Sequence, residues 1–309
     1  MAAGPVIIDA DYGGGDSGRL AIPAIFANHK GGVGKTFVMC LMAAELAQRR
    51  NRSGNPRRVL CLDMDPQGNL TRRMGYLEEE IDERPSMAEA IYSATPGALQ
   101  TCLIPCQWEA EWAENITLGP ARIELENRIP EAGIPGSHLR LRKALTPLLH
   151  LFDDVLIDVA PTLGHLLHLS LACRKPDEDG RGVNVISVMT PNYDGIRGVR
   201  RLERLIRDPE YHLSLNMQAD MFGVVINGVR SGVLTHEERT AEAEETWGGI
   251  VWTPYLHLSA SAERAVEFSE PPQSAEDAKT RTALRQAAET YVDHYLTVIG
   301  EPELRKVTA

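Results

Sequence analysis

Lys30-Gly31-Gly32-Val33-Gly34-Lys35-Thr36 is the stretch of this sequence that decides its fold. The residues before it, Ala21 to Ala27, are almost all apolar and predict a buried strand. The residues after it, Phe37 to Arg50, have the apolar spacing and the Ala, Leu and Met content of a helix. A strand, a glycine-rich loop and a helix in this order form the context in which such a loop binds phosphate.

The loop has the composition that a phosphate site requires. Gly31, Gly32 and Gly34 permit a tight turn and a close approach of the backbone to phosphate oxygens. The turn directs N–H groups and the positive end of the helix at that charge. Lys35 is placed to reach the outer phosphates of a nucleotide, and the Thr36 hydroxyl to ligate Mg²⁺. The alternative, a glycine-rich turn that binds nothing, leaves Gly-Lys-Thr at this spacing and in this context unexplained.

Two further apolar runs end in carboxylates. Arg58 to Asp63 predicts a strand that is followed by Asp65, and Asp153 to Asp158 predicts another. The carboxyl ends of parallel strands line the ligand crevice of an open α/β sheet. Taken alone, each of these carboxylates could belong to an acidic turn or to an ordinary strand end without a function. In order after the phosphate loop, they predict a site for nucleotide hydrolysis in which Asp158 holds Mg²⁺ through a water.

A second lysine, Lys30, opens the loop, and this deviant Walker A motif resembles that of the ParA/MinD family of dimerising ATPases. The run from Asp63 to Asn69, DMDPQGN, is similar to the second signature of that family. The resemblance implies that Lys30 reaches across a dimer interface to the nucleotide of the partner subunit. It also implies that Asp65 orients or activates the attacking water, with Asp63 in a supporting or Mg²⁺-related role.

The resemblance extends to the rest of the ATP site. Asn227, after a strand predicted over 221–226, is implied to contact the adenine base. Pro254, the end of the last predicted strand at 250–254, and Tyr255, which follows it, would lie on the other side of the base. The nucleotide-binding residues implied in this way are Gly31, Gly32, Val33, Gly34, Lys35, Thr36, Phe37, Asn227, Pro254 and Tyr255, and the metal-site residues are Thr36, Asp63 and Asp158. At Phe37 relatives often carry a second threonine.

The predicted fold is α/β: a doubly wound, mainly parallel sheet with helices on both faces. Residues 1–19 are expected to form a flexible arm, residues 20–300 a single ATPase domain, and residues 301–309 a short polar tail. Helices are predicted over 86–92, 101–114, 139–151, 164–173 and 275–299, and a buried strand over 183–189. The segment 101–114 carries Trp108 and Trp112, which are expected to pack inward from a helix.

Composition limits the possible partners. The 309 residues carry a formal net charge of −11, so that contact with nucleic acid requires a local basic patch. No apolar run is long enough to span a bilayer, and the tail lacks the amphipathic helix with which a MinD-type member binds a membrane. The expectation is a cytoplasmic protein, associated with the nucleoid if it binds DNA. Of the five cysteines, Cys40, Cys61 and Cys173 are expected to be inert core residues, and Cys102 and Cys106 are four apart without a second Cys/His pair at metal-ligand spacing.

One segment supplies a basic patch. Between residues 197 and 207, four arginines advance by three, four and three positions and therefore share one helical face. Such a stripe is a candidate contact for a phosphate backbone, and a solvated face with Glu203 and Asp208 as partners is an equal alternative. The candidate DNA-binding residues are Arg197, Arg200, Arg201, Arg204 and Arg207, together with Arg230, which the resemblance aligns with a basic residue that holds DNA.

Two functions stay open. The first is an ATP-dependent homodimer that binds non-specific DNA, segregates a plasmid or chromosome, and is released when a ParB-like partner stimulates hydrolysis. The second is a related ATPase that positions a protein cargo without DNA. The acidic charge favours the second function, as does the segment Tyr255 to Leu258, where relatives carry an arginine. A metabolic synthetase would need an acceptor pocket that the sequence does not reveal.

Overall fold

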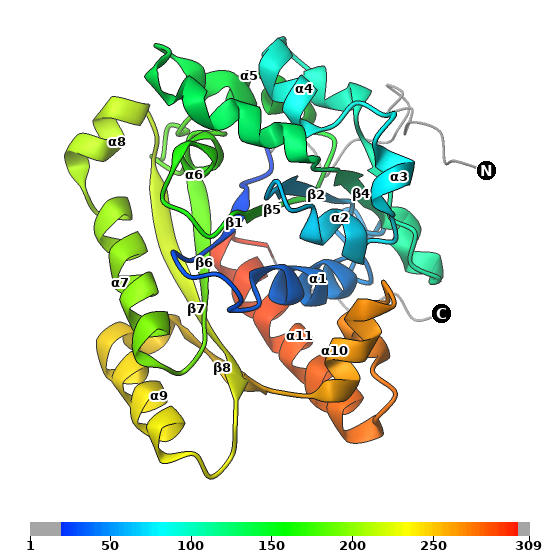
Figure 1. Ribbon diagram of the computed structural model, residues 1–309, viewed down its shortest axis with the longest axis vertical. Helices are drawn as coiled ribbons and strands as arrows, with labels where there is room; N and C mark the ends of the chain where they lie inside the picture. Colours follow the sequence, from blue (N-terminus) through cyan, green and yellow to red (C-terminus); the bar gives the residue numbers. More distant parts are fainter. Residues whose placement is uncertain (1–19, 302–309) are drawn as a thin grey trace.

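The computed structural model describes residues 20–301 (Figure 1). The predicted arm at 1–19 and residues 302–309 of the predicted tail lie outside the described residues. None of the helices in the described part is both long and apolar enough to cross a bilayer.

Eight strands form one sheet, and its order places the strand that precedes the glycine loop near the middle. The strands are β1 (Ala24–Ala27), β2 (Val59–Met64), β3 (Ile104–Pro105), β4 (Ile116–Gly119), β5 (Asp154–Val159), β6 (Val183–Met189), β7 (Ala219–Val229) and β8 (Val251–His257). Their order in the sheet is β3-β4-β2-β5-β1-β6-β7-β8. Only β3 is antiparallel to its neighbour among the described strands. The predicted fold class is therefore confirmed.

Helices cover both faces of the sheet (Figure 1). The α-helices are α1 (Lys35–Leu46), α2 (Asn69–Arg73), α3 (Glu78–Ile81), α4 (Met87–Ser93), α5 (Arg140–Leu145), α6 (His165–Leu171), α7 (Tyr193–Ile206), α8 (Pro209–Leu215), α9 (Leu234–Trp247), α10 (Ala260–Glu267) and α11 (Ala278–Val298). The 3₁₀ helices are η1 (Ala98–Thr101), η2 (Glu111–Asn115), η3 (Ile123–Gly133), η4 (Ser137–Leu139), η5 (Thr146–Leu148), η6 (Gly248–Ile250) and η7 (Pro272–Ser274).

Three apolar clusters hold these layers together. One is built around α1 and α11, a second around α4, α5 and α6, and a third, smaller one lies where α7 and α9 meet β6 and β7. Strands β2 and β5 are buried along their whole length, as expected for parallel strands covered on both faces. Ten of the twelve residues of α1 are buried, so the helix that follows the glycine loop is a core element.

The prediction of a helix over 101–114 is wrong. Ile104 and Pro105 instead form β3, which pairs with β4, and a short 3₁₀ helix, η2, follows. Trp108 is nevertheless buried, and its Nε1 donates to the carbonyl of Arg73. Pairing of Ile104 and Pro105 with a strand that lies later in the chain overrides the local helical pattern.

Other helical segments also differ from the sequence-based expectation, among them α2, α3, α8 and α10, which the sequence does not predict. The helix predicted over 139–151 ends at Leu145, and Pro147 lies in the 3₁₀ helix that follows. The sequence does not predict α9, because only Ala243 and Trp247 of its residues are buried and the segment has little apolar periodicity. By contrast, α4 begins as predicted: Ser86 accepts from the Ala88 N–H, and Glu89 completes a capping box.

A buried ion pair joins the first residue of β5 to the residues that lead into β2. Arg57 is 2% exposed and donates from Nε and Nη2 to the carboxylate of Asp154 at 2.8 and 2.9 Å. Burial raises the pKa of Asp154, and the Arg57 charge opposes that rise. The pair fixes the amino ends of two neighbouring strands whose carboxyl ends carry the candidate site.

We predict that Arg57→Met lowers the free energy of unfolding by about 3–5 kcal/mol, because the substitution leaves a buried carboxylate unpaired. Urea unfolding followed by circular dichroism measures this change. Arg181→Met is the matched control, since Arg181 pairs with Asp177 and Asp179 at the surface, and its change should stay within about 1 kcal/mol. Equal effects of the two substitutions would contradict the assignment.

Candidate active site

The glycine loop connects the carboxyl end of β1 to the first residue of α1, as predicted. Gly32 and Gly34 have φ angles of 71° and 93°, in the left-handed region that favours glycine. A Cβ at Gly34 would also fall 2.1 Å from Nδ2 of Asn227. The loop therefore requires glycine at position 34 for both its conformation and its packing, and the amino end of α1 faces into it.

Two asparagines hold the loop in this shape. Asn227, within β7, donates from Nδ2 to the carbonyl of Val33 at 2.9 Å. Asn28 donates from Nδ2 to the carbonyl of Val188 at 2.7 Å and accepts from the N–H of Lys30 at 2.9 Å. The loop is thereby anchored to β6 and β7, so its backbone is arranged by the protein itself.

Lys35 is a buried cation that is surrounded by carboxylates. Burial lowers the pKa of Lys35, and the charges of Asp158 and Asp65 oppose this effect. The lysine and the two aspartates, predicted from three separate motifs, therefore share one electrostatic environment. Because burial destabilises the charged form of Lys35, a further negative charge, such as that of a phosphate, would stabilise it.

Thr36 and Asp158 form a direct contact. The Thr36 hydroxyl donates to Oδ2 of Asp158 at 2.5 Å. The other carboxylate oxygen, Oδ1, is buried and has no hydrogen-bond partner within residues 20–301. Burial raises the pKa of Asp158 to about 6, and Lys35 opposes the rise. A hydroxyl and a buried, unsatisfied carboxylate oxygen side by side are the donor set that suits Mg²⁺.

Asp63 lies directly beside Asp158 in the pairing of β2 with β5. Burial, followed by the charge of Asp158, raises the pKa of Asp63 to about 8. Its Oδ1 accepts from the N–H of Asp65 at 3.1 Å, and its Oδ2 accepts from the N–H and the hydroxyl of Thr71 at 2.9 and 2.8 Å. The carboxylate of Asp63 thus fixes the backbone at both ends of the segment from Asp65 to Thr71.

Asp65 is half-buried, and its Oδ1 accepts from the N–H of Gln67 at 3.1 Å. It lies at the start of the turn between β2 and α2, close enough to Lys35 for their charges to interact. Among the described residues, the structure therefore brings Lys35, Thr36, Asp63, Asp65 and Asp158 together at the carboxyl edge of the sheet, as the sequence predicts.

Comparisons with known proteins agree with this geometry. The model of the AAA_31 family, described as an AAA domain, matches residues 22–216. The chain belongs to this family, and it is an ATPase of the ParA/MinD type.

Sequence relatives support the same assignment, and a solved structure shows the same fold. The chromosome partitioning protein ParA of Myxococcus xanthus is 34% identical over 167 residues, which are 52% of this chain and 53% of that protein. An uncharacterized protein of Mycobacterium tuberculosis, Rv1708, is 29% identical over 262 residues, covering 82% and 70% of the two chains. The structure of an ATP complex of a Cyanothece McdA variant superposes with a TM-score of 0.72 at 18% identity, covering 94% of this chain and 100% of that one, and shows the shared fold.

The lysine that marks the ParA/MinD type lies at the amino end of α7. Nζ of Lys30 is 3.5 Å from Oδ1 of Asn192 and 3.5 Å from Oδ2 of Asp194. Asn192 is also the N-cap of α7, accepting from the Gly195 N–H at 2.8 Å. Both Lys30 and Asp194 are partly exposed, so this contact within the subunit is weak.

The residues that the family resemblance assigns to the nucleotide base are arranged in two groups. Asn227 contacts the loop itself. The Tyr255 hydroxyl instead contacts Glu244 of α9, and the Pro254 carbonyl accepts from the hydroxyl of Tyr291 in α11 at 2.5 Å. Phe37 is half-buried and packs against the cluster around α1. The structure thus places Tyr255 toward α9, and only Asn227 of these residues bonds to the loop.

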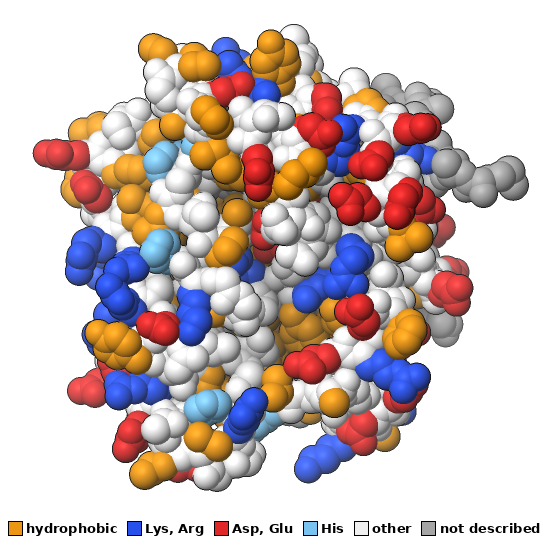
Figure 2. Space-filling model, in the orientation of Figure 1, with side chains coloured by type: hydrophobic (Ala, Val, Ile, Leu, Met, Phe, Trp, Pro, Cys, Tyr) orange, Lys and Arg blue, Asp and Glu red, His pale blue; other side chains and the backbone are white. Residues whose placement is uncertain are grey.

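Arginines of the predicted stripe gather along α7 (left side of Figure 2), with acidic side chains among them. Arg200 pairs with Glu242 at 2.9 Å and Arg207 with Glu203 at 2.8 Å. Arg201 is half-buried and contacts Nδ1 of His29 at 3.0 Å. Three of the predicted arginines are exposed and have no ion pair within the described part of the chain: Arg197, Arg204 and Arg230.

Sequence reasoning missed several residues of the site, and Thr71 is the clearest example. Thr71 donates to Asp63 and also accepts from the N–H of Ala121 at 3.0 Å. Nothing in the sequence marks a threonine six positions after Asp65 as a partner of the site. Asn28 carries a weak signal, because it lies just ahead of the glycine loop.

We predict that Thr71→Val slows ATP turnover at least about tenfold while changing the affinity for ATP by less than about threefold. The substitution keeps the shape of the side chain but leaves Asp63 and the Ala121 N–H each short of one hydrogen bond, which releases the turn that carries Asp65. Steady-state ATPase kinetics and titration with a fluorescent ATP analogue separate the two effects. Thr282→Val is the control, because that hydroxyl bonds only within α11. An unchanged turnover number in Thr71→Val would contradict the role of Thr71.

Proposed function

We propose that this chain is a Mg²⁺-dependent ATPase that dimerises when it binds ATP, binds non-specific DNA in that state, and is released by hydrolysis that a ParB-like partner stimulates. The observation that carries the proposal is the group formed by Lys35, Thr36, Asp65 and Asp158 around one preformed glycine loop. ParA/MinD-type membership supports the nucleotide chemistry. Similarity to a chromosome partitioning protein supports the segregation of DNA as its use.

Thr36 and Asp158 are the residues that would hold Mg²⁺, directly or through water. The ion would neutralise charge on the outer phosphates. The unsatisfied Oδ1 of Asp158 is a group that such an ion would satisfy. Lys35 adds a second positive charge at the same phosphates, and the loop N–H groups bind the inner ones.

Asp65 is the group that orients the attacking water. Its position is set by Asp63 and Thr71 rather than by contacts of its own carboxylate with core residues. A partner that shifts the segment between β2 and α2 therefore changes the position of Asp65 relative to the phosphates. This arrangement supports hydrolysis that is slow alone and faster with a partner, because catalysis of this kind is mainly positioning and charge neutralisation.

Lys30 would complete the site of the partner subunit. To do so it must leave Asn192 and Asp194, and the cost is small because the contacts are long and exposed. A triphosphate on the facing subunit offers Lys30 a stronger anion than Asp194 does. ATP on both subunits is therefore what would favour the dimer.

We predict that Asp65→Ala still binds ATP, loses at least about 100-fold in turnover, and becomes a dimer with ATP and Mg²⁺. Adding Lys30→Ala to that variant should return it to a monomer, although each subunit still binds ATP. Size-exclusion chromatography with light scattering, run with ATP and with ADP, measures the assembly. Lys35→Ala is the control that binds no nucleotide. Full ATPase activity in Asp65→Ala, or a stable dimer in the double variant, would contradict these roles.

DNA contact is assigned to α7. Its exposed arginines lie along one face, and Arg197 and Arg204 have no acidic partner in the described part of the chain. An arginine without a local carboxylate can pair with a DNA phosphate without first breaking an ion pair. In a protein with a net charge of −11, such a face is the place where a polyanion can approach.

We predict that Arg197→Ala with Arg204→Ala weakens ATP-dependent DNA retention and lowers the slope of log affinity against log salt by about 2, because two phosphate contacts are lost. Arg200→Ala with Arg207→Ala is the matched control on the same helix, and its effect should be smaller because glutamates partly neutralise these arginines. Gel shifts over a range of salt concentrations, in the Asp65→Ala background, measure both quantities.

The second candidate function, positioning of a protein cargo without DNA, is favoured by the same ion pairs, which neutralise part of the α7 stripe. It is also favoured by Tyr255-Leu256-His257-Leu258, where relatives carry an arginine. The gel shift separates the two functions. Absence of any ATP-dependent retention of DNA at low salt would assign the chain to the second.

A further inference from the structure

The residues that lead into the glycine loop form polar contacts with α7 at two places. Nδ1 of His29 accepts from Nη1 of Arg201 at 3.0 Å, because a guanidinium group has only donors to offer. Nζ of Lys30 lies 3.5 Å from Oδ1 of Asn192 and 3.5 Å from Oδ2 of Asp194, at the amino end of the helix. The two contacts are therefore separated along α7 by about two turns of helix.

A third contact lies between these two, and a glycine makes it possible. A Cβ at Gly198 would fall 2.0 Å from Oδ1 of Asn28, so the backbone of α7 lies directly against this side chain. Asn28 is 2% exposed, and the same Oδ1 accepts from the N–H of Lys30. Because no side chain separates α7 from the residue that anchors the start of the loop, a displacement of either one must be accommodated by the other.

These contacts use one face of α7 and leave another face for a ligand. Asp194, Gly198 and Arg201 advance by four and three positions, which places them on the same side of the helix. Arg197 and Arg204 are exposed on the adjacent side and have no ion pair within the described residues. One side of α7 thus contacts the start of the glycine loop, and the other presents unpaired cations.

The two polar contacts differ in how readily they break. The side chains of Lys30 and Asp194 are 34% and 64% exposed, so their contact is weak, and the proposed function requires Lys30 to leave it. His29 and Arg201 are both half-buried, and the length of their hydrogen bond is ordinary. After Lys30 has left, His29 keeps its polar contact with α7.

We propose that the hydrogen bond between His29 and Arg201 is the link through which α7 holds the glycine loop ready for a triphosphate, so that ATP at the loop and a polyanion on α7 strengthen each other's binding. His29 is a positioning residue, since it acts through the backbone of the loop. A polyanion on Arg197 and Arg204 would order α7, and order that one ligand has established lowers the cost of binding the other. The polyanion rests on the proposed function, whereas the link itself requires only that the chain binds ATP.

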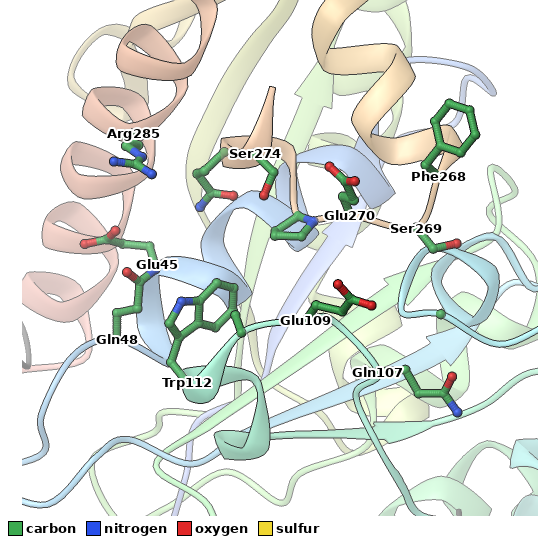
Figure 3. Close-up of a pocket in the computed structure, with 14 residues that line it drawn as sticks. Glu45, Gln48, Gln107, Glu109, Trp112, Phe268, Ser269, Glu270, Ser274 and Arg285 are labelled. Carbon is green, nitrogen blue, oxygen red and sulfur yellow. The ribbon is translucent and has the colours of Figure 1, made fainter. Parts of the chain in front are cut away.

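A second element begins at the loop, and it provides a control. α1 starts at Lys35, and its far end borders a cavity of about 710 Å³ that Glu45 and Gln48 help to line (Figure 3). Among the described residues, neither α7 nor residues 28–30 contribute to the lining of that cavity. A substitution at Gln48 therefore alters an element that is joined to the loop without altering the link.

The test is a double-mutant cycle on the full chain, in which titration with a fluorescent ATP analogue measures the affinity. We expect His29→Leu and Arg201→Leu each to weaken binding about fivefold, and the double variant to weaken it by about the same factor, because all three lose one hydrogen bond. His29→Gln should bind nearly as well as the wild type, since its side-chain oxygen still accepts. Gln48→Ala, and Arg239→Leu at an ion pair of α9, are controls that should change the affinity by less than about twofold.

Effects that multiply in the double variant, to about 25-fold, would overturn the proposal, because substitutions that act independently add in free energy. An affinity in His29→Leu equal to that of the wild type would overturn it as well. So would a loss in His29→Gln as large as that in His29→Leu, since the acceptor would then not be what matters.

The polyanion is tested by repeating the titration with plasmid DNA at low salt, in the Asp65→Ala background. DNA should tighten ATP binding about fivefold when His29 is present and should have no effect on it in His29→Leu. Equal tightening in both chains would overturn the proposal. A cycle that behaves as expected in a chain that retains no DNA would support the link and refute the DNA-binding function, whereas DNA retention with multiplied effects in the cycle would do the reverse.

Discussion

The pairing of β2 with β5 determines where the carboxylates of the candidate site lie. Its register places Asp63 beside Asp158 at the edge of the sheet where β1 ends and the glycine loop begins. Two buried carboxylates side by side repel each other, and the surrounding residues stabilise them in different ways. Thr71 and the backbone donate to Asp63, whereas Asp158 has the Thr36 hydroxyl, the charge of Lys35 and one oxygen without a partner in the described part of the chain. That oxygen is the point at which a metal ion would bind most favourably.

The same arrangement divides the site into a fixed part and an adjustable part. The glycine loop is fixed, since Asn28 and Asn227 anchor it to neighbouring strands and α1 is buried along nearly its whole length. The segment that carries Asp65 depends on hydrogen bonds to a single carboxylate and on a short helix. The position of Asp65 is therefore easier to change than that of the glycine loop.

The overall charge and the local charges have different effects in this protein. A net charge of −11 repels polyanions from most of the surface. Along α7 the arginines locally reverse that sign, although glutamates within and beside the helix neutralise two of them.

Local sequence patterns predict the parallel α/β fold, the glycine loop with its lysine and threonine, and the two strands that end in aspartates. These follow from short stretches in which neighbouring residues act together. Tertiary structure alone decided that Thr71 supports Asp63, that Lys30 contacts Asn192, and that residues 104–105 form an edge strand in place of a helix. The physical reason is that each of these depends on a partner that folding brings near, 8 positions away for Thr71 and 162 for Lys30, and no local pattern records such a partner.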